Sequence, residues 1–553
     1  MVALLLLPVA AGLIGTLLPA FGGLRPGQPA AFSLAPWAQM SATPGIAHSA
    51  FLSLKVGLIS TALATGLALL IVAGWHGTRA FRAIETALSP LLSVPHAAAA
   101  LGLAFLIAPS GWLLRVFSPA LTGWSRPPDL LILQDPGGWS LIFGLVAKEL
   151  PFLLLMLLAA LPQARPAERM RVAFAAGYGR VMGWALVVLP SVYAQLRLPV
   201  YAVLAYGMSN VDMALVLGPS TPPMLSVTIL RWMSDPDLAL RAPAAAAALV
   251  QLALVLGALG LWRAGERGMA ALGRWILWRG PRGAGVLGVT ARGAGLGFGA
   301  LAALAVFGGL ASHLIWSFAG RWRFPEALPE GLRLRIWARH GAEILDIASA
   351  TLLLAFAVAL VALLLVLASL EAQHRRGWAL GASGQGVLYL PLILPQITFL
   401  PGLQILLLSL GAAQGWAPVF AAHLVFVLPY TYLSLSGPFR AWDSRLATLA
   451  ASLGAGPNRV FWRLRLPMLA APLLTALAVG MAVSVGQYLP TLLASGGRVT
   501  TLTTEALALA SGGDRRVIGA WALALTVAAW APFALAIFVP RLLYRRRKGV
   551  LNG

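Results

Sequence analysis

Cysteine is absent from the 553-residue sequence, and charged residues make up only 10% of it. The first absence excludes disulfide bonds, thiol catalysis and cysteine-ligated metals. The second excludes a water-soluble globular protein, because an average soluble domain carries about 25% charged residues. Hydrophobic residues make up 59% of the chain, and apolar runs of about 20 residues, the length that spans a bilayer as a helix, recur throughout it. We therefore expect a protein that crosses a membrane many times.

Acidic residues are scarce as well: 17 Asp and Glu stand against 40 Lys and Arg, of which only three are Lys. In a soluble protein, a net charge of +23 would suggest nucleic acid as a partner. In a membrane protein the same excess is typical of basic cytoplasmic loops that face anionic lipid. We therefore expect the lipid bilayer, and no nucleic acid, as a partner.

Twelve apolar runs bounded by charged or Pro/Gly-rich segments predict an all-α membrane protein with about 12 transmembrane helices. The first run has no basic residue ahead of it, which favours a membrane helix over a cleaved signal sequence. The third run is interrupted by Pro109 and Gly111, and the ninth by three prolines. The runs lie near residues 1–21, 50–74, 91–116, 139–162, 191–215, 243–262, 294–318, 345–370, 387–411, 417–436, 468–495 and 518–540.

The orientation follows from the Lys and Arg residues in the connecting segments. The segments on one side hold 24 of them and those on the other side hold 12, although the two sets have similar total length. Because basic loops remain in the cytoplasm, this excess predicts that both termini are cytoplasmic. The expected location is a bacterial inner membrane.

Two matched patterns indicate that the chain is internally duplicated. The spacing from Gly177 to Pro190 equals the spacing from Gly454 to Pro467, and the second copy begins half a chain length after the first. Pro95–Gly102 and Pro395–Gly402 form a second matched pair in the third span of each half. We therefore expect two pseudo-symmetric six-helix halves, at 1–270 and 294–553, joined by a basic cytoplasmic linker at 271–293.

The duplicated Gly-to-Leu-Pro segments lie on the basic side, between the fourth and fifth spans of each half, at 165–190 and 442–467. The second copy, DSRLATLAASLGAGPNRVFWRLRLPML, resembles the EAA loop of the permease subunits of binding-protein-dependent ABC importers. The family's Glu position is occupied by Arg171 and Thr448, and the second Ala of its pair by Ala173 and Ala450. The first copy is therefore the weaker match, and amphipathic cytoplasmic loops without this role are its alternative interpretation.

The resemblance implies a MetI-like type I importer fold and a role as the membrane permease. It also implies two cytoplasmic ABC ATPases as partners, a periplasmic solute-binding protein, and a small-molecule or ion solute. The ATPases would dock on the loops at eight positions: Arg171, Ala173, Gly177, Pro190, Thr448, Ala450, Gly454 and Pro467. More narrowly, the chain is similar to the one-chain permeases of ferric-iron and thiamine importers, and most similar to the YnjC-type permeases.

Polar residues within the spans are candidates for the translocation path, because such groups are costly in a bilayer unless they face protein or water. Asn210 and Gln487 follow the matched prolines of their loops at the same spacing, and His96 and Gln396 each come directly after the other matched proline. Asp212 is a further candidate. Ordinary hydrogen bonding between helices is the alternative for each of them.

Catalytic machinery is not expected on this chain. None of the three lysines follows a glycine, so a nucleotide-binding P-loop is missing, and ATP and magnesium are expected only on the partner ATPase. The seven histidines show no spacing typical of metal ligands. The alternatives are an ion-coupled secondary transporter with internal repeats and a membrane-embedded enzyme such as a lipid-modifying transferase.

Overall fold

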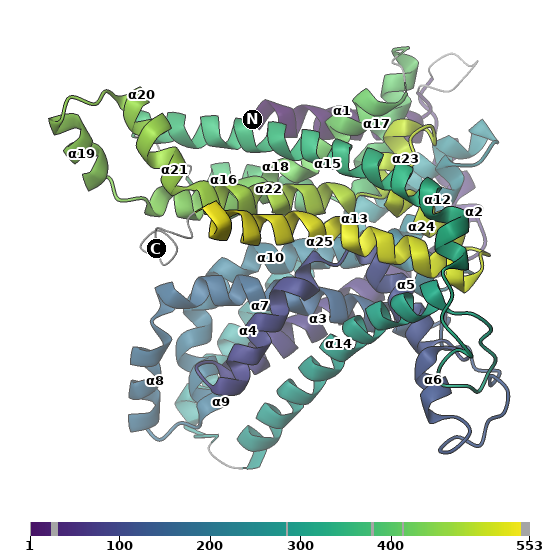
Figure 1. Cartoon of the computed structure of the whole chain (residues 1–553), viewed down its shortest axis with the longest axis horizontal. Coiled ribbons are helices and arrows are strands. Elements are labelled where there is room, and N and C mark those ends of the chain that lie inside the picture. Colours follow the sequence, from purple (N-terminus) through teal and green to yellow (C-terminus); the bar gives the residue numbers. More distant parts are fainter. Residues whose placement is uncertain (1, 24–30, 284–285, 378–380, 412–413, 544–553) are drawn as a thin grey trace.

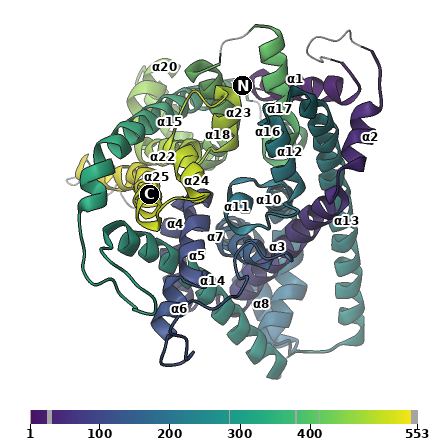
Figure 2. The same ribbon diagram turned by 90° about the vertical axis from the view of Figure 1, so that its right-hand side faces the viewer.

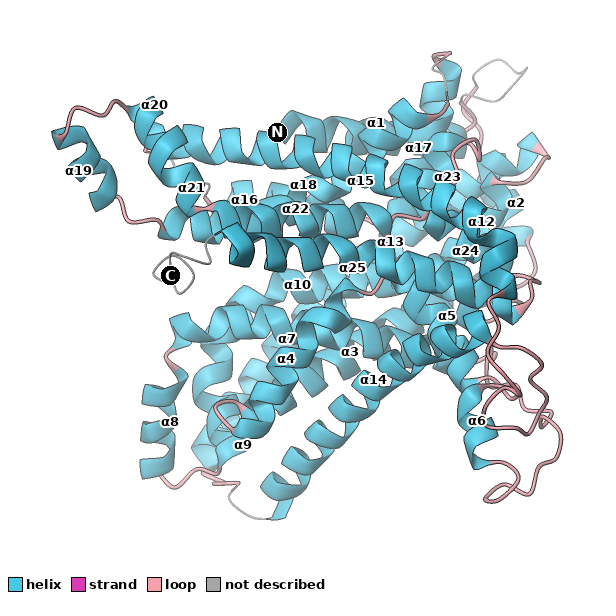
Figure 3. Cartoon of the chain, viewed as in Figure 1, coloured by secondary structure: helices cyan, strands magenta, loops and turns pink. Residues whose placement is uncertain are grey.

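The computed structural model describes residues 2–23, 31–283, 286–377, 381–411 and 414–543. Within these residues every regular element is a helix (Figure 3), and the β-pairing is a single isolated bridge between Ala319 and Leu332. The fold is an all-α membrane bundle, as the sequence predicted.

The described residues of the first half form α- and 3₁₀-helical elements and a π-helix, η1. They are α1 (Val2–Ala20), α2 (Ala35–Ala42), α3 (Ile46–Trp75), α4 (Arg79–Ser93), α5 (His96–Ile107), α6 (Trp112–Phe117), α7 (Trp139–Ala164), α8 (Pro166–Ala175), α9 (Arg180–Gly183), η1 (Trp184–Val188), α10 (Leu189–Ser209), α11 (Asp212–Leu217), α12 (Leu225–Met233), η2 (Leu238–Leu240) and α13 (Arg241–Arg279).

The second half repeats this order and also contains a π-helix, η3. Its elements are α14 (Val286–Phe318), α15 (Arg335–Arg375), α16 (Ala382–Ile393), α17 (Gln396–Ser409), α18 (Trp416–Ala441), α19 (Arg445–Ser452), α20 (Pro457–Val460), η3 (Phe461–Arg465), α21 (Leu466–Met468), α22 (Ala470–Val485), α23 (Leu489–Ser495), α24 (Leu502–Ala510) and α25 (Arg515–Leu543).

Ten helices of the described residues are long and apolar enough to cross a membrane, and two bent helix pairs raise the number to 12. Each predicted span overlaps one of them. The bend between α16 and α17 is 86° and lies at Pro395, where a proline disfavours helical geometry in the residue before it. The third predicted span needs correction: it is also broken at Pro95, so that its first residues belong to the amphipathic α4.

The internal repeat is visible in the backbone. The π-helices at 184–188 and 461–465 are separated by the same offset as Gly177 and Gly454, and so are α12 and α24. The N-terminal backbone N–H of α12, at Leu225, donates to Ser53 of α3, and that of α24, at Leu502, donates to Thr351 of α15, both at 3.0 Å. The two halves are therefore built to one plan.

The first helix of each half packs on the other half. α1 lies along α17, and α14 lies along α5 (Figure 1). Both crossings use the matched glycines: a Cβ added to Gly402 would lie 2.1 Å from the Gly12 carbonyl oxygen, and one added to Gly102 would lie 2.8 Å from Gly309. Thr16 also donates a 2.8 Å hydrogen bond to the Thr398 carbonyl. The exchanged helices tie the two halves together.

The predicted linker at 271–293 is largely helical. α13 continues to Arg279, and α14 begins at Val286. Arg282, which follows α13, lies beside the start of α9, since the Gly179 N–H donates to the Arg282 carbonyl at 2.7 Å. The linker is therefore packed against the first Gly-to-Leu-Pro segment.

The bundle has two distinct ends. α8 and α19 project from one end, whereas α6 and the loops that follow it lie at the opposite end (Figure 1). A view turned by 90° shows two groups of helices (Figure 2). On one side lie the second-half helices α15, α18, α22 and α25, and on the other lie α3, α10 and α13. We call the interface between these two groups of helices the seam.

Candidate functional site

The first Gly-to-Leu-Pro segment forms a compact helical module. α8 turns at Gly177, whose φ of +80° is a left-handed conformation that favours glycine, and the chain re-enters the bundle through α9 and η1. Ala173 is 2% exposed, and its Cβ lies 3.0 Å from where a Cβ on Gly183 would be. Arg169 fixes α8 by donating to the Val187 carbonyl at 3.1 Å.

The second segment repeats this module but is less anchored. α19 turns at Gly454, again with a φ of +80°, and the chain continues through α20 and η3. α19 has no buried residue and packs mainly on α20. Its predicted positions Thr448 and Ala450 are exposed and half-buried, respectively.

An arginine in each module binds the end of the long helix beside it. In the second half, Arg465 is 4% exposed and donates to Glu371 at 2.9 Å and to His374 at 2.7 Å, both on α15. In the first half, Arg180 donates to the carbonyls of Ala73 and His76 at the end of α3. Each module is thereby attached to the end of a long apolar helix.

The environment of His76 is dominated by burial. Burial lowers its pKa below the ordinary value of 6.5; the carboxylate of Glu85 opposes this effect and the charge of Arg180 adds to it. His76 is therefore kept neutral near pH 7, beside a module that already carries several arginines.

Apolar side chains are exposed at the tips of both modules. Val172 on α8 is 69% exposed, and Leu449, which occupies the equivalent position of the repeat on α19, is 61% exposed. Phe174 and Leu453 extend these two patches. Because both helices project from the bundle, these side chains form two apolar surfaces of equivalent position, which we call the α8 tip and the α19 tip.

The two prolines of the predicted loops lie where the chain returns to the membrane. Pro190 is at the beginning of α10 and Pro467 is in α21, and each helix follows directly on a π-helix. Arg171 is exposed. All eight predicted loop residues therefore lie in the two modules, at one end of the bundle.

The predicted path residues do not form one set. His96 and Asp212 lie in one polar cluster in the seam, described below. Asn210 is 2% exposed and caps α11, since its amide oxygen accepts from the Ala214 N–H at 3.1 Å. Gln487 is buried and Gln396 is half-buried, on the second-half side. The side-chain hydrogen bonds of Asn210 are local, whereas the side chains of His96 and Asp212 contact groups from other helices.

Lys148 and Glu149, neighbours on α7, have different partners. The Lys148 ammonium donates to the carbonyls of Leu91 and Leu92 at 3.2 and 3.0 Å, at the end of α4. Glu149 instead accepts a 3.1 Å hydrogen bond from Nε2 of His96. Lys148 thus satisfies the carbonyls that α4 leaves open where it breaks.

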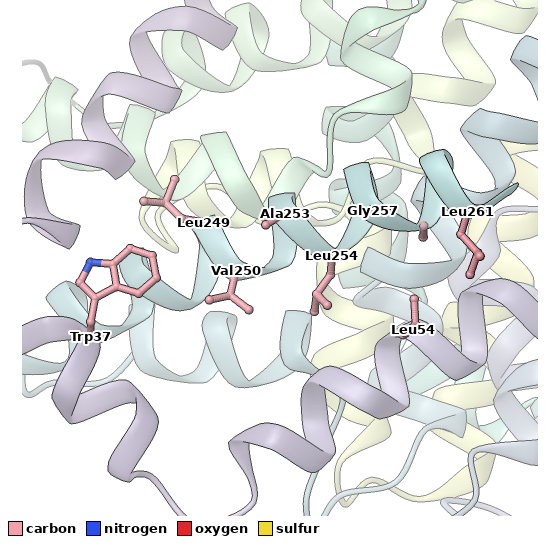
Figure 4. Close-up of a pocket in the computed structure, with 9 residues that line it drawn as sticks. Trp37, Leu54, Leu249, Val250, Ala253, Leu254, Gly257 and Leu261 are labelled. Atoms are coloured by element: carbon pink, nitrogen blue, oxygen red, sulfur yellow. The ribbon is translucent and has the colours of Figure 1, made fainter. Parts of the chain in front are cut away.

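An apolar groove of about 400 Å³ runs along α13 on the outside of the bundle (Figure 4). Leu249, Val250, Leu254 and Leu261 line it, with Trp37 of α2 at one end and Leu54 of α3 beside it. Its surface is that of a helix in contact with hydrocarbon, and it lacks the polar groups that fix the orientation of a solute.

Comparison with known proteins finds a relative that matches nearly the whole chain and a family model that matches most of its second half. Residues 365–549 match the family model described as "Binding-protein-dependent transport system inner membrane component". The chain is 32% identical over 536 residues, 94% of its length and 93% of the relative's, to the inner membrane ABC transporter permease protein YnjC of Escherichia coli K12.

Two further relatives match parts of the chain. It is 30% identical over 215 residues to the putative 2-aminoethylphosphonate transport system permease protein PhnV of Salmonella typhimurium, covering 37% of this chain and 78% of PhnV. It is 29% identical over 120 residues to the putrescine transport system permease protein PotI of Escherichia coli K12, covering 20% of this chain and 42% of PotI.

Proposed function

Because the chain belongs to the binding-protein-dependent inner membrane permeases of ABC importers, we propose that α8 and α19 are the two surfaces on which cytoplasmic ATPases dock. The chain is the transmembrane permease subunit of such an importer. Two ATPase subunits, which carry ATP and magnesium, would then bind one module in each half.

The observation that carries this proposal is the pair of equivalent apolar tips. Val172 and Leu449 stand at the same position of two repeated modules, and both are largely exposed. Apolar side chains that gather on a projecting surface often mark a site where a partner binds. Two equivalent tips at one end of the bundle fit two copies of one partner.

The modules also provide a route for the motion. When the ATPases close, they would move α8 and α19. Arg180 and Arg465 would pass that movement to α3 and α15, whose packing partners line the seam. Two rigid halves that rock against each other would open the seam alternately to either side.

The other assignments follow from the orientation. With α8 and α19 in the cytoplasm, both chain termini are cytoplasmic, and the end that carries α6 is periplasmic. A solute-binding protein would deliver its solute there. One relative is named for putrescine and another for 2-aminoethylphosphonate, so the family by itself does not fix one solute for this chain.

Glutamate substitutions at the two tips test the docking proposal. Val172→Glu and Leu449→Glu, purified with the ATPase from the native membrane, are expected to retain less of it, because a carboxylate would be buried in the interface. Leu328→Glu, at a position that is 64% exposed on the opposite end, is the matched control and should retain the normal amount. Full ATPase retention in both tip variants would contradict the proposal.

A further inference from the structure

A continuous chain of polar side chains crosses the first-half side of the seam. The carboxylate of Glu149 lies 3.1 Å from Nε2 of His96. The ring of His96 lies 4.7 Å, between centroids, from that of Tyr206. The Tyr206 hydroxyl then donates to Asp212 at 2.9 Å. Residues from α5, α7, α10 and α11 are thus joined in one cluster.

The second half faces this cluster with phenol groups. Tyr430 of α18 is close enough to Glu149 to interact with it electrostatically, and Tyr488, just before α23, is close enough to Asp212. The repeat does not reproduce the carboxylates: the second-half positions equivalent to Glu149 and Asp212 are Phe426 and Leu489. Acidic groups on one side therefore meet aromatic groups on the other.

The cluster is not closed on itself. Glu149 and Asp212 are only 8% and 9% exposed, yet each has a second carboxylate oxygen that accepts no hydrogen bond from the part of the chain that the structure describes. The side chains of His96, Tyr206, Tyr430 and Tyr488 are half-buried. Neither second oxygen is among the buried polar atoms that lack a partner, so both oxygens are accessible. Two accessible carboxylate oxygens, with partly accessible aromatic rings around them, form an acidic site that can accept a positive charge.

We propose that this cluster is a binding site for an organic cation on the translocation path, so that the imported solute carries an ammonium group. Aromatic faces attract organic cations, and adjacent carboxylates add charge-assisted hydrogen bonds. The Lys148 ammonium does not fill the site, because it is bound to the carbonyls of Leu91 and Leu92. The inference rests on the proposed function only in taking the seam as the path.

A hard metal ion suits the cluster less well. Calcium takes about six to eight oxygen ligands, whereas two carboxylates stand here among rings. An organic cation needs no such set of oxygen ligands. It can leave water for contacts with aromatic rings and with one or two carboxylate oxygens. The aromatic rings therefore decide between the two classes of cation.

The absence of native cysteine permits a direct measurement of the charge at this site. In a Tyr430→Cys variant of the full chain, the introduced thiol is the only one. The measurement compares how fast this thiol reacts with two methanethiosulfonates, one carrying a trimethylammonium group and one carrying a sulfonate. Each rate is divided by the rate of the same reagent with free 2-mercaptoethanol, which corrects for the reagent's own reactivity. Two carboxylates at about 10 Å should favour the cationic reagent about tenfold, even at the dielectric constant of water.

Adding Glu149→Gln and Asp212→Asn to this variant keeps the side-chain sizes and removes both charges. The preference for the cationic reagent should then fall to about onefold. A ratio near one in Tyr430→Cys itself, a ratio unchanged by the two amide substitutions, or no labelling by either reagent would each overturn the proposal. Retention of the ATPase by these variants shows that they are folded and that the docking surfaces, proposed separately, are intact.

Ligand protection gives the second readout. Tetramethylammonium at millimolar concentration should slow labelling of Tyr430→Cys by an uncharged methanethiosulfonate severalfold, and neopentyl alcohol, of similar shape but neutral, should not. Equal protection by both compounds, or protection by neither, would contradict a cation site. Loss of the tetramethylammonium effect in the doubly amidated variant would assign it to the two carboxylates.

Discussion

The close contact between α1 and α17 predicts that one added methyl group at Gly402 should destabilise the protein. In Gly402→Ala the new Cβ would lie 2.1 Å from the Gly12 carbonyl oxygen, 2.2 Å from Thr16 Oγ1 and 2.3 Å from the Thr16 nitrogen. Two of these are backbone atoms, so no side-chain rotation relieves the overlap. To restore an ordinary contact of 3.4 Å, the α1 backbone must move by about 1.3 Å.

Such overpacking costs about 1–3 kcal/mol or more, because neighbouring side chains lose their contacts as well. The Thr16 hydrogen bond to the Thr398 carbonyl would break with it. Gly402→Ala should therefore lower the Tm of the purified permease by several degrees. Gly102→Ala, at 2.8 Å from Gly309, should lower it less.

The assay is the temperature at which half of the protein is lost from its size-exclusion peak in detergent. Gly66→Ala is the control, because a Cβ added to Gly66 on α3 meets no atom within 4 Å, and alanine favours a helix. If Gly402→Ala is as stable as Gly66→Ala, the close helix crossing is wrong. The same outcome would contradict the exchange of first helices between the halves.

Two other predictions concern the modules. Glu371→Gln removes a charge partner of the buried Arg465 and should lower the free energy of unfolding by about 3 kcal/mol, measured as a lower melting temperature of the purified permease. Glu343→Gln, at an exposed pair, should change that temperature little, and equal effects would contradict the role of Arg465. Arg282→Ala removes a guanidinium that lies 4.8 Å from the Tyr178 ring centroid. Amide hydrogen exchange should then become faster around Gly177 but not around Gly454. Unchanged exchange at Gly177 would mean that the linker does not hold the first module.

The sequence predicted the number of spans and their order because long apolar runs are set by the thickness of the bilayer. It also predicted the duplication, because each copy needs a glycine where the backbone has a positive φ and a proline near the start of the next helix. These two requirements give both copies the same Gly-to-Pro spacing. The π-helices were not predicted, because their residues, WALVV and FWRLR, share no pattern that distinguishes them from an α-helix.

Packing between distant segments was beyond reach of the sequence. Gly15 and Gly402 meet at a helix crossing; the repeat singled out Gly402, but nothing in the sequence indicates Gly15 as its partner among 58 glycines. In the polar cluster, His96 and Asp212 were predicted as path residues from their cost in a bilayer, whereas Tyr206, which joins them, gave no signal because tyrosine is ordinary in membrane helices. Asn210 was predicted as a path residue by its match with Gln487, but its side chain accepts a hydrogen bond from the Ala214 N–H at the start of α11.

The central claim, that one chain carries two equivalent ATPase docking surfaces, is tested most directly by counting subunits. Native mass spectrometry of the importer purified through a tag on this chain should show two ATPase subunits per permease chain. Val172→Glu and Leu449→Glu should each reduce that number to one. A wild-type complex with a single ATPase, or one whose ATPases survive both substitutions together, would contradict the account.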